Sequence, residues 1–326
     1  MRFQIEKLIV MADNKNKITT PLSAPSSRSG FIIGNACILL ASIFWGVNVT
    51  FTKALIPEWM SADSIVAVRL VGGCILFWLA SLFVKCESVQ RQDWLKLVLG
   101  GVIGLFSFIY LFVTSLKFGN AIDISIIMTL PPVFVILINV LFRHKHTSWF
   151  EIIGVLVSFV GAAVVLLDGG KGKNGSDNLV GDLLAIASTI CYAFYLVILE
   201  KPTHTYKPVT MLRWVFLFAA IPALFLIPGM QHEGILESRS ATPWLEIAFI
   251  LLFPTFAAYF LVQPAEKRIG SELVSLYQYL LPVFATISAV AMGIDHLKWL
   301  QVIAMGIIIA GMVVTNIGKR RHSDNT

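Results

Sequence analysis

The chain has 326 residues, of which 57% are hydrophobic and 13% are charged, whereas soluble domains hold about 45 to 50% apolar and about 25% charged residues. This composition excludes an ordinary water-soluble protein. The formal net charge of +6 does not indicate nucleic-acid binding either, because no basic run interleaved with aromatic residues marks a soluble module.

A succession of apolar runs follows a polar N-terminal segment, and each run is close to the roughly 20 residues that cross a bilayer. They predict ten transmembrane helices, at residues 31–53, 62–84, 95–116, 123–142, 150–167, 179–199, 210–229, 244–263, 272–293 and 298–318. The polar segment lacks the order of a signal peptide and is expected to be a disordered cytoplasmic tail. Met11 is an alternative start.

The second half of the chain repeats the first. Trp94, Lys117, Pro132, Trp149 and Gly161 recur 150 positions later as Trp244, Lys267, Pro282, Trp299 and Gly311. The predicted organisation is a tail at 1–30, a first five-helix repeat at 31–168, a linker at 169–178, a second repeat at 179–318 and a basic cytoplasmic tail at 319–326.

Because each repeat holds an odd number of helices, the second repeat must cross the membrane in the opposite sense. The expected fold is an all-α integral membrane protein with ten transmembrane helices in a 5+5 inverted repeat. Secondary transporters commonly have this construction, with a substrate site between the repeats that opens alternately to each side. A duplication that merely enlarged a membrane scaffold is the alternative.

Basic residues indicate the orientation, since short cytoplasmic loops are enriched in Lys and Arg. With the N-terminus inside, 17 basic residues fall in cytoplasmic segments and six on the far side, and two lie within helices. This asymmetry predicts a multi-pass protein of the plasma membrane, or of the inner membrane in bacteria, with both termini in the cytoplasm.

Several of these landmarks together resemble a known family. Trp45-Gly46, Arg69, Pro132, Gly154 and Gly161, with their echoes in the second half, are similar in order and spacing to the EamA type of the drug/metabolite transporter superfamily, over about residues 31–318. The resemblance implies ten helices in five-plus-five inverted topology and transport of small metabolites, often amino acids or related compounds. The central cavity would lie among helices one, three, four, six, eight and nine.

One feature departs from that family. An acidic residue often ends the fourth helix there, whereas this chain reads Arg143-His144-Lys145-His146. A role for that carboxylate therefore does not carry over. The two histidines have a spacing that suits a metal, but no carboxylate or cysteine lies near them in sequence, and a solvated basic loop explains them more simply.

Two arginines lie inside predicted helices, where a charged side chain is costly and commonly functional. Arg69 lies about eight residues inside the second helix, and Arg213 is placed similarly in the seventh. Each guanidinium would either receive a substrate carboxylate or brace the packing of the bundle. Both are candidate substrate-binding residues.

Polar and aromatic residues follow single faces of five predicted helices, in matching positions of both halves. The candidates for solute contact among them are Trp45, Asn48, Tyr110, Tyr192, Tyr195, Tyr259 and Gln278. Any one such stripe also suits helix packing, but together they favour a shared lumen for an amphipathic solute. Pro132 and Pro282 interrupt helices four and nine and are either hinges or static kinks.

The source of energy is not a nucleotide. The glycine-rich segment 169–175 lacks the spacing of a phosphate-binding loop, and we expect no cofactor and no metal. Transport would use an ion or substrate gradient. Asp63, Asp123, Asp182, Glu246 and Asp295 lie near predicted helix ends rather than at mid-bilayer, which argues against a proton antiporter built on a buried acid and leaves facilitated diffusion or exchange open.

The sequence therefore predicts a secondary transporter that exports small metabolites, such as amino acids or related amphipathic compounds, by alternating access. Its partners would be a small-molecule substrate, membrane lipid and a coupling ion or counter-substrate, with no nucleic acid. The alternatives are a non-transporting membrane sensor or scaffold, or a polytopic membrane enzyme. An enzyme is not expected, because no cluster of catalytic residues lies at membrane depth.

Overall fold

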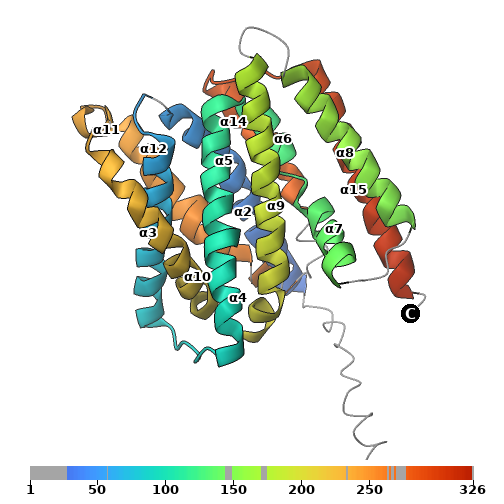
Figure 1. Ribbon diagram of the computed structural model, residues 1–326, viewed down its shortest axis with the longest axis horizontal. Helices are drawn as coiled ribbons and strands as arrows, with labels where there is room; N and C mark the ends of the chain where they lie inside the picture. Colours follow the sequence, from blue (N-terminus) through green and yellow to red (C-terminus); the bar gives the residue numbers. More distant parts are fainter. Residues whose placement is uncertain are drawn as a thin grey trace, which may run out of the picture.

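The computed structural model describes residues 28–56, 58–143, 149–169, 175–232, 234–262, 264–265, 268 and 277–324. Every regular element in these residues is a helix, and the helices run mostly side by side in one bundle (Figure 1). Most of the predicted N-terminal tail, the centre of the predicted linker, His144 and His146 lie outside the described residues.

The first repeat begins with two long helices and continues with segmented ones. Its elements are α2 (Arg28–Leu55), α3 (Ala62–Phe83), η1 (Arg91–Asp93), α4 (Trp94–Leu99), η2 (Gly100–Phe106), α5 (Ser107–Phe118), α6 (Ala121–Ile127), α7 (Pro131–Arg143) and α8 (Trp149–Gly169). The stretch from η1 to α5 forms one long rod, because each segment continues directly into the next.

The second repeat has the same succession. Its elements are α9 (Gly175–Thr205), α10 (Pro208–Ala223), η3 (Leu224–His232), α11 (Gly234–Glu237), α12 (Thr242–Ile250), η4 (Leu251–Ala257), η5 (Gln278–Leu280), α14 (Leu281–Ala291) and α15 (Trp299–Asp324). After η4 the helical conformation continues to Val262.

Seven helical stretches among the described residues are long and apolar enough to cross a membrane, and Ile152–Val165, Leu281–Ala291 and Trp299–Thr315 form shorter apolar helices. These ten stretches coincide with the ten segments predicted from sequence. That all ten cross the membrane stays a prediction. The helical class is confirmed for the described residues.

The outer surface of the bundle is apolar. Leu82, Phe83, Phe225 and Trp299 are each more than three-quarters exposed, and many other large hydrophobic side chains share this surface. A water-soluble monomer rarely exposes so large an apolar area. Lipid is the solvent that suits it, so the protein is an integral membrane protein.

The last helices of the two repeats, α8 and α15, pack along one another at one side of the bundle (Figure 1). Gly154 near the start of α8 meets Gly311 in the middle of α15, whereas Gly161, farther along α8, meets Ala304 nearer the start of α15. A Cβ atom on Gly154 would overlap the backbone carbonyl oxygen of Gly311. Glycine thus allows the close approach of two backbones that membrane helices use for association.

These contacts show how the two repeats are related. The sequence repeat makes Gly311 the counterpart of Gly161, and Ala304 the counterpart of Gly154, at the 150-residue offset. Gly154 therefore meets the counterpart of Gly161, and Gly161 meets the counterpart of Gly154. Because early residues meet late ones, the two helices run antiparallel, as the inverted repeat requires.

We predict that Gly154→Ala lowers the melting temperature of the detergent-solubilised protein, because the new methyl group overlaps α15, and overpacking typically costs about 1–3 kcal/mol. Gly306→Ala on α15 is the matched control, since a Cβ atom there meets nothing within 4 Å. Thermal unfolding followed by intrinsic fluorescence measures both. Equal melting temperatures for the two variants would contradict the close contact.

Candidate functional site

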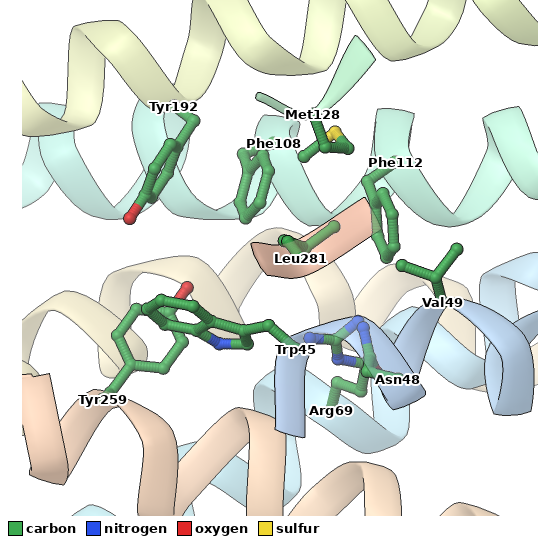
Figure 2. A pocket seen from close by; sticks show the side chains of 10 residues that line it. All are labelled: Trp45, Asn48, Val49, Arg69, Phe108, Phe112, Met128, Tyr192, Tyr259 and Leu281. Atoms are coloured by element: carbon green, nitrogen blue, oxygen red, sulfur yellow. The ribbon is translucent and has the colours of Figure 1, made fainter. Parts of the chain in front are cut away.

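A cavity of about 60 Å³ lies between the two repeats. It is lined by Trp45, Asn48, Val49, Arg69, Phe108, Phe112, Met128, Tyr192, Tyr259 and Leu281. Figure 2 shows Trp45, Asn48, Arg69 and Tyr259 along one side and Phe108, Met128 and Tyr192 along the other. The lining comes from α2, α3, α5 and the residue after α6 in the first repeat, and from α9, the helix after η4, and α14 of the second.

The cavity is small in this conformation. An engineered cavity of about 150 Å³ holds one benzene molecule, so about 60 Å³ is too little space for an amino acid. A solute of that size would enter only if side chains or helices moved apart. The structure therefore shows the site in a contracted form.

Trp45 joins α2 of the first repeat to the eighth predicted helix. Its indole Nε1 donates a hydrogen bond to the carbonyl oxygen of Pro254 at 3.2 Å, and its ring meets Tyr259 edge to face at 5.9 Å. Pro254 lies within η4, a segment of π-helix. The indole thus satisfies a backbone acceptor at a place where the regular helical ladder is disrupted.

Arg69 is 4% exposed and borders the cavity from α3. Its Nε donates to Oγ1 of Thr255 at 3.2 Å, and that hydroxyl donates to the carbonyl oxygen of Ile250 at 2.8 Å. Nη1 of Arg69 is buried and has no hydrogen-bond partner among the described residues. A guanidinium carries five N–H donors in a fixed fork, so donors remain for an anionic ligand.

Asn48 is 4% exposed and lies three residues after Trp45 on α2. Its Oδ1 accepts a hydrogen bond from Oγ1 of Thr52 at 3.4 Å. This amide is therefore, with Arg69, one of the few polar groups in a wall formed mostly by aromatic and aliphatic side chains.

The predicted tyrosines are placed differently from one another. Tyr192 and Tyr259 line the cavity. Tyr195 is buried behind Tyr192, and their rings stack at 5.7 Å. Tyr110 is partly buried and stacks on Phe106 at 5.8 Å, and it is not among the lining residues. Tyr192 also packs on Phe108 at 4.7 Å, which joins α9 to α5.

Arg213 is not among the residues that line the cavity. Its guanidinium lies 5.3 Å from the ring of Trp78 and 5.4 Å from that of Trp214, in cation–π geometry. Trp94 packs on Trp214 as well, at 4.7 Å. Of the two symmetry-related arginines, only Arg69 is therefore placed at the cavity, and Arg213 lies on an aromatic cluster between α3, α4 and α10.

The predicted hinge prolines lie in the first turns of helices. Pro132 is the second residue of α7 and Pro282 the second residue of α14, where a missing N–H costs no helical hydrogen bond. The fourth predicted helix is broken at residues 128–130, between α6 and α7, and the first of these residues, Met128, lines the cavity. A hinge role stays a prediction. Gln278 begins η5, and its side chain lies outside the described part of the chain.

Two π-helical segments occupy equivalent places in the repeats, and the sequence reasoning missed both. They are η2 and η4, which begin 151 residues apart at Gly100 and Leu251. π-Helical turns inside α-helices often occur at functional sites. The only signals in the sequence were Pro254 in one segment and the glycines Gly100, Gly101 and Gly104 in the other.

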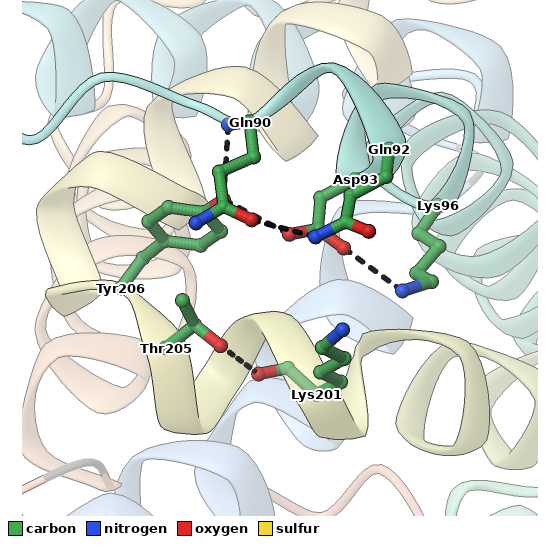
Figure 3. Close-up of polar contacts among 7 residues, drawn as sticks. All are labelled: Gln90, Gln92, Asp93, Lys96, Lys201, Thr205 and Tyr206. Carbon is green, nitrogen blue, oxygen red and sulfur yellow. Dashed lines mark hydrogen bonds and ion pairs between the residues drawn. The ribbon is translucent and has the colours of Figure 1, made fainter.

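At one end of the bundle, polar side chains tie the connector between α3 and α4 to the connector between α9 and α10 (Figure 3). The phenol of Tyr206 donates to Asp93 at 2.9 Å and accepts from the N–H of Gln90 at 3.1 Å. Lys96 forms an ion pair with Asp93 at 2.8 Å. Burial raises the pKa of Tyr206, so its phenol remains a donor at neutral pH. We call these four residues the Tyr206 network.

The connector between α3 and α4 also bonds to Lys207, just before α10, and to the first turn of α10. The N–H of Glu87 donates to Oγ1 of Thr210 at 3.2 Å, and the N–H of Lys207 donates to Oε2 of Glu87 at 2.8 Å. The two repeats are therefore held together at this end by hydrogen bonds as well as by packing.

Comparison with known proteins identifies the family. The model of the EamA-like transporter family matches residues 32–167 and again residues 179–317. The chain belongs to the EamA-like transporter family. This confirms the resemblance seen in the sequence and places the protein among membrane transporters.

Individual relatives of this EamA-like protein agree. It is 23% identical over 278 residues to the uncharacterized transporter YyaM of Bacillus subtilis (strain 168), covering 84% of this chain and 90% of that one. It is 24% identical over 196 residues to the uncharacterized inner membrane transporter YedA of Escherichia coli (strain K12), covering 60% and 61%. A solved crystal structure shares the fold, with a TM-score of 0.59 at 19% identity, covering 90% of this chain and 98% of the other.

Within the described part of this EamA-like chain, no group of three or more His, Cys, Asp and Glu side chains could hold a metal ion. The polar groups at the cavity are an amide, a guanidinium, phenols and an indole. They can bind and orient a solute by hydrogen bonds and ring contacts. They include no nucleophile paired with a base, which is what covalent catalysis would need.

We predict that Tyr206→Phe lowers the melting temperature, because it removes a donor from the buried carboxylate of Asp93 and leaves the Gln90 N–H without its partner. An unsatisfied buried group costs about 1–3 kcal/mol. Tyr277→Phe is the matched control: it removes one hydrogen bond, from Tyr277 to Oδ1 of Asn35 at 2.7 Å, at a half-buried place. A drop no larger than that of the control would show that the Tyr206 network does not stabilise this conformation.

Proposed function

We propose that this protein is a secondary transporter that exports a small amphipathic metabolite, such as an amino acid or a related compound, by alternating access. The observation that carries the proposal is the cavity between the repeats, where Arg69 keeps unpartnered donors beside aromatic side chains. The family supports transport, and the cavity suggests the kind of solute.

The chemistry of the cavity suits a solute with one anionic end and one apolar part. A carboxylate matches the fork of a guanidinium and forms strong charge-assisted hydrogen bonds with it. Asn48 offers a further polar contact, and the rings of Trp45, Tyr192 and Tyr259 offer apolar surface. Ligand sites typically combine a mostly apolar lining with a few polar groups that fix orientation.

The relation of the repeats supports alternating access. Antiparallel counterparts such as α8 and α15 mean that rocking one repeat against the other can close the site on one side and open it on the other. The cavity is contracted in this conformation, and the Tyr206 network joins the repeats at one end of the bundle. Opening that end would break the network.

The distribution of basic residues supports the orientation of the transporter. We propose ten membrane crossings, both termini in the cytoplasm and a location in the plasma membrane, because the predicted inner segments carry 17 of the 25 Lys and Arg residues. The Tyr206 network, which joins the connectors that contain Lys85 and Lys207, would then lie at the cytoplasmic end.

We predict that a thermal-shift screen of the purified protein against amino acids finds a stabilising compound, since a ligand that binds the folded state stabilises it by mass action, by about 2.7 kcal/mol at 100 times Kd. Arg69→Gln should abolish the shift because it removes the cationic donor. Arg213→Gln should lower the melting temperature yet keep the shift, because its guanidinium lies on Trp78 and Trp214. If only Arg213→Gln lost the ligand-induced shift in melting temperature, Arg213 and not Arg69 would be the residue that binds the ligand.

We predict that Asn48→Ala weakens transport of the solute found by that screen, with a higher KM in proteoliposomes, because the solute loses a hydrogen-bonding group. Asn35→Ala is the control: Asn35 lies on the same helix, and its Nδ2 bonds the carbonyl oxygen of Phe31, away from the cavity. Unchanged kinetics for Asn48→Ala at normal expression would remove Asn48 from the site.

A further inference from the structure

Two buried carboxylates meet at the end of the bundle opposite the Tyr206 network. Asp123 on α6 is 1% exposed and Asp182 on α9 is 0% exposed, and the two helices pack on each other. Both lie near helix ends, as the sequence predicted, but neighbouring helices cover them. Position along the helix therefore does not argue against a buried acid at these two residues.

Asp123 is fully partnered as a carboxylate. Its Oδ1 accepts from Nε2 of Gln301 at 2.7 Å, and its Oδ2 accepts from Nδ2 of Asn120 at 3.2 Å. Oε1 of Gln301 accepts the N–H of Lys298 at 2.8 Å, which turns the amide nitrogen of Gln301 toward Asp123. The negative charge of Asp123 is therefore stabilised by two oriented donors.

Asp182 is in the opposite situation. Both of its carboxylate oxygens are buried and have no hydrogen-bond partner among the described residues. The charged groups that act on it are Asp123 on α6, which disfavours its charge, and Lys298 before α15, which favours it. A buried carboxylate without donors is costly when ionised, and a nearby second carboxylate adds to that cost.

The other charged groups of this region are engaged elsewhere. Lys53 at the end of α2 donates to the carbonyl oxygens of Leu116 at 2.6 Å and Gly119 at 2.9 Å. Asp295, between α14 and α15, accepts the N–H groups of Ile122 at 3.2 Å and His296 at 2.8 Å. Neither is bonded to Asp182.

We propose that Asp182 is a proton-binding site that couples proton movement to solute transport, an inference that rests on the transport function proposed above. In this conformation the side chain holds the proton as a neutral carboxylic acid. When this end of the bundle opens, water reaches Asp182, the O–H bond breaks, the proton passes to water and a solvated carboxylate remains. Closing the end requires a proton to bind again.

Packing explains why opening is needed. Gly181, next to Asp182, lies against Gly119 so closely that a Cβ atom on Gly181 would overlap the backbone nitrogen of Gly119. Water does not fit between backbones at that distance. Hydration of Asp182 therefore requires α9 to move away from the connector between α5 and α6.

The same helices reach the cavity. Tyr192 lies ten residues after Asp182 on α9, roughly 15 Å along the helix at 1.5 Å per residue. Met128, directly after α6, lines the cavity and accepts a hydrogen bond from Oγ of Ser188 on α9 at 3.4 Å. Movement of α9 against α6 would thus change the acid pair and the cavity together.

Proton binding can be measured without knowing the solute. Infrared spectra of the whole protein in lipid, recorded across a pH titration, should show the C=O stretch of a protonated carboxyl group at neutral pH. Asp182→Asn should remove this band, and Asp182→Ser should do the same if the amide disturbs folding. Asp177→Asn, an exposed site on the same helix, and Asp123→Asn should retain it.

Coupling is measured in proteoliposomes with a radiolabelled amino-acid mixture. In the wild type a pH gradient should drive accumulation of the labelled amino acids in the more acidic compartment. Asp182→Asn should lose this accumulation and keep exchange of labelled for unlabelled solute, whereas Asp177→Asn should behave as the wild type.

The outcomes separate the two proposals. A band that persists in Asp182→Asn, or that sodium abolishes, would overturn the proton site, as would accumulation by Asp182→Asn equal to that of the wild type. An infrared band lost only in the Asp182 variants would support proton binding even if no amino acid is transported. In that case only the proposal that the solute is an amino acid or a related compound would be wrong.

Discussion

Inside a bilayer, a polar group must find its partner within the protein, because lipid offers none. The cavity of this EamA-like protein is built around that constraint. Pro254 and the π-helical segment that contains it leave backbone carbonyl groups to be satisfied, and Trp45 and Thr255 supply the donors. Thr255 in turn accepts from Arg69. The residues that satisfy the disrupted helix are thus the ones that hold the arginine at the cavity wall.

The two repeats are symmetric in how their helices pack, but they contribute different residues to the cavity. Gly154, Gly161, Ala304 and Gly311 pair across α8 and α15 as the inverted symmetry demands, and η2 and η4 occupy equivalent places. The two arginines do not share this equivalence: Arg69 borders the cavity, whereas two tryptophan rings cover the guanidinium of Arg213. The duplication gives two similar helix bundles that can move against each other, and sequence divergence between them leaves only one arginine at the cavity.

The polar groups at the two ends of the bundle also differ. At one end the charged groups of the Tyr206 network are satisfied: Asp93 pairs with Lys96 and accepts a hydrogen bond from Tyr206 on the other connector. At the other end Asp123 is satisfied and Asp182 is not. Because α9 runs from Asp182 past Tyr192 to the neighbourhood of Tyr206, one rigid helix links both ends to the cavity. A shift of this helix is the simplest motion that changes all three places at once.

The sequence by itself determined the helical class, the duplication and the family, because apolar length and a 150-residue offset are one-dimensional properties. It also selected Trp45, Asn48, Arg69, Tyr192 and Tyr259, which the structure brings to one cavity. Only the tertiary structure decided that Tyr110 and Arg213 are not among its lining residues, that two helices contain π-turns and that Asp123 and Asp182 are buried. The physical reason is that burial and hydrogen-bond partners depend on which helices pack together, and the position of a residue along its own helix does not reveal its neighbours.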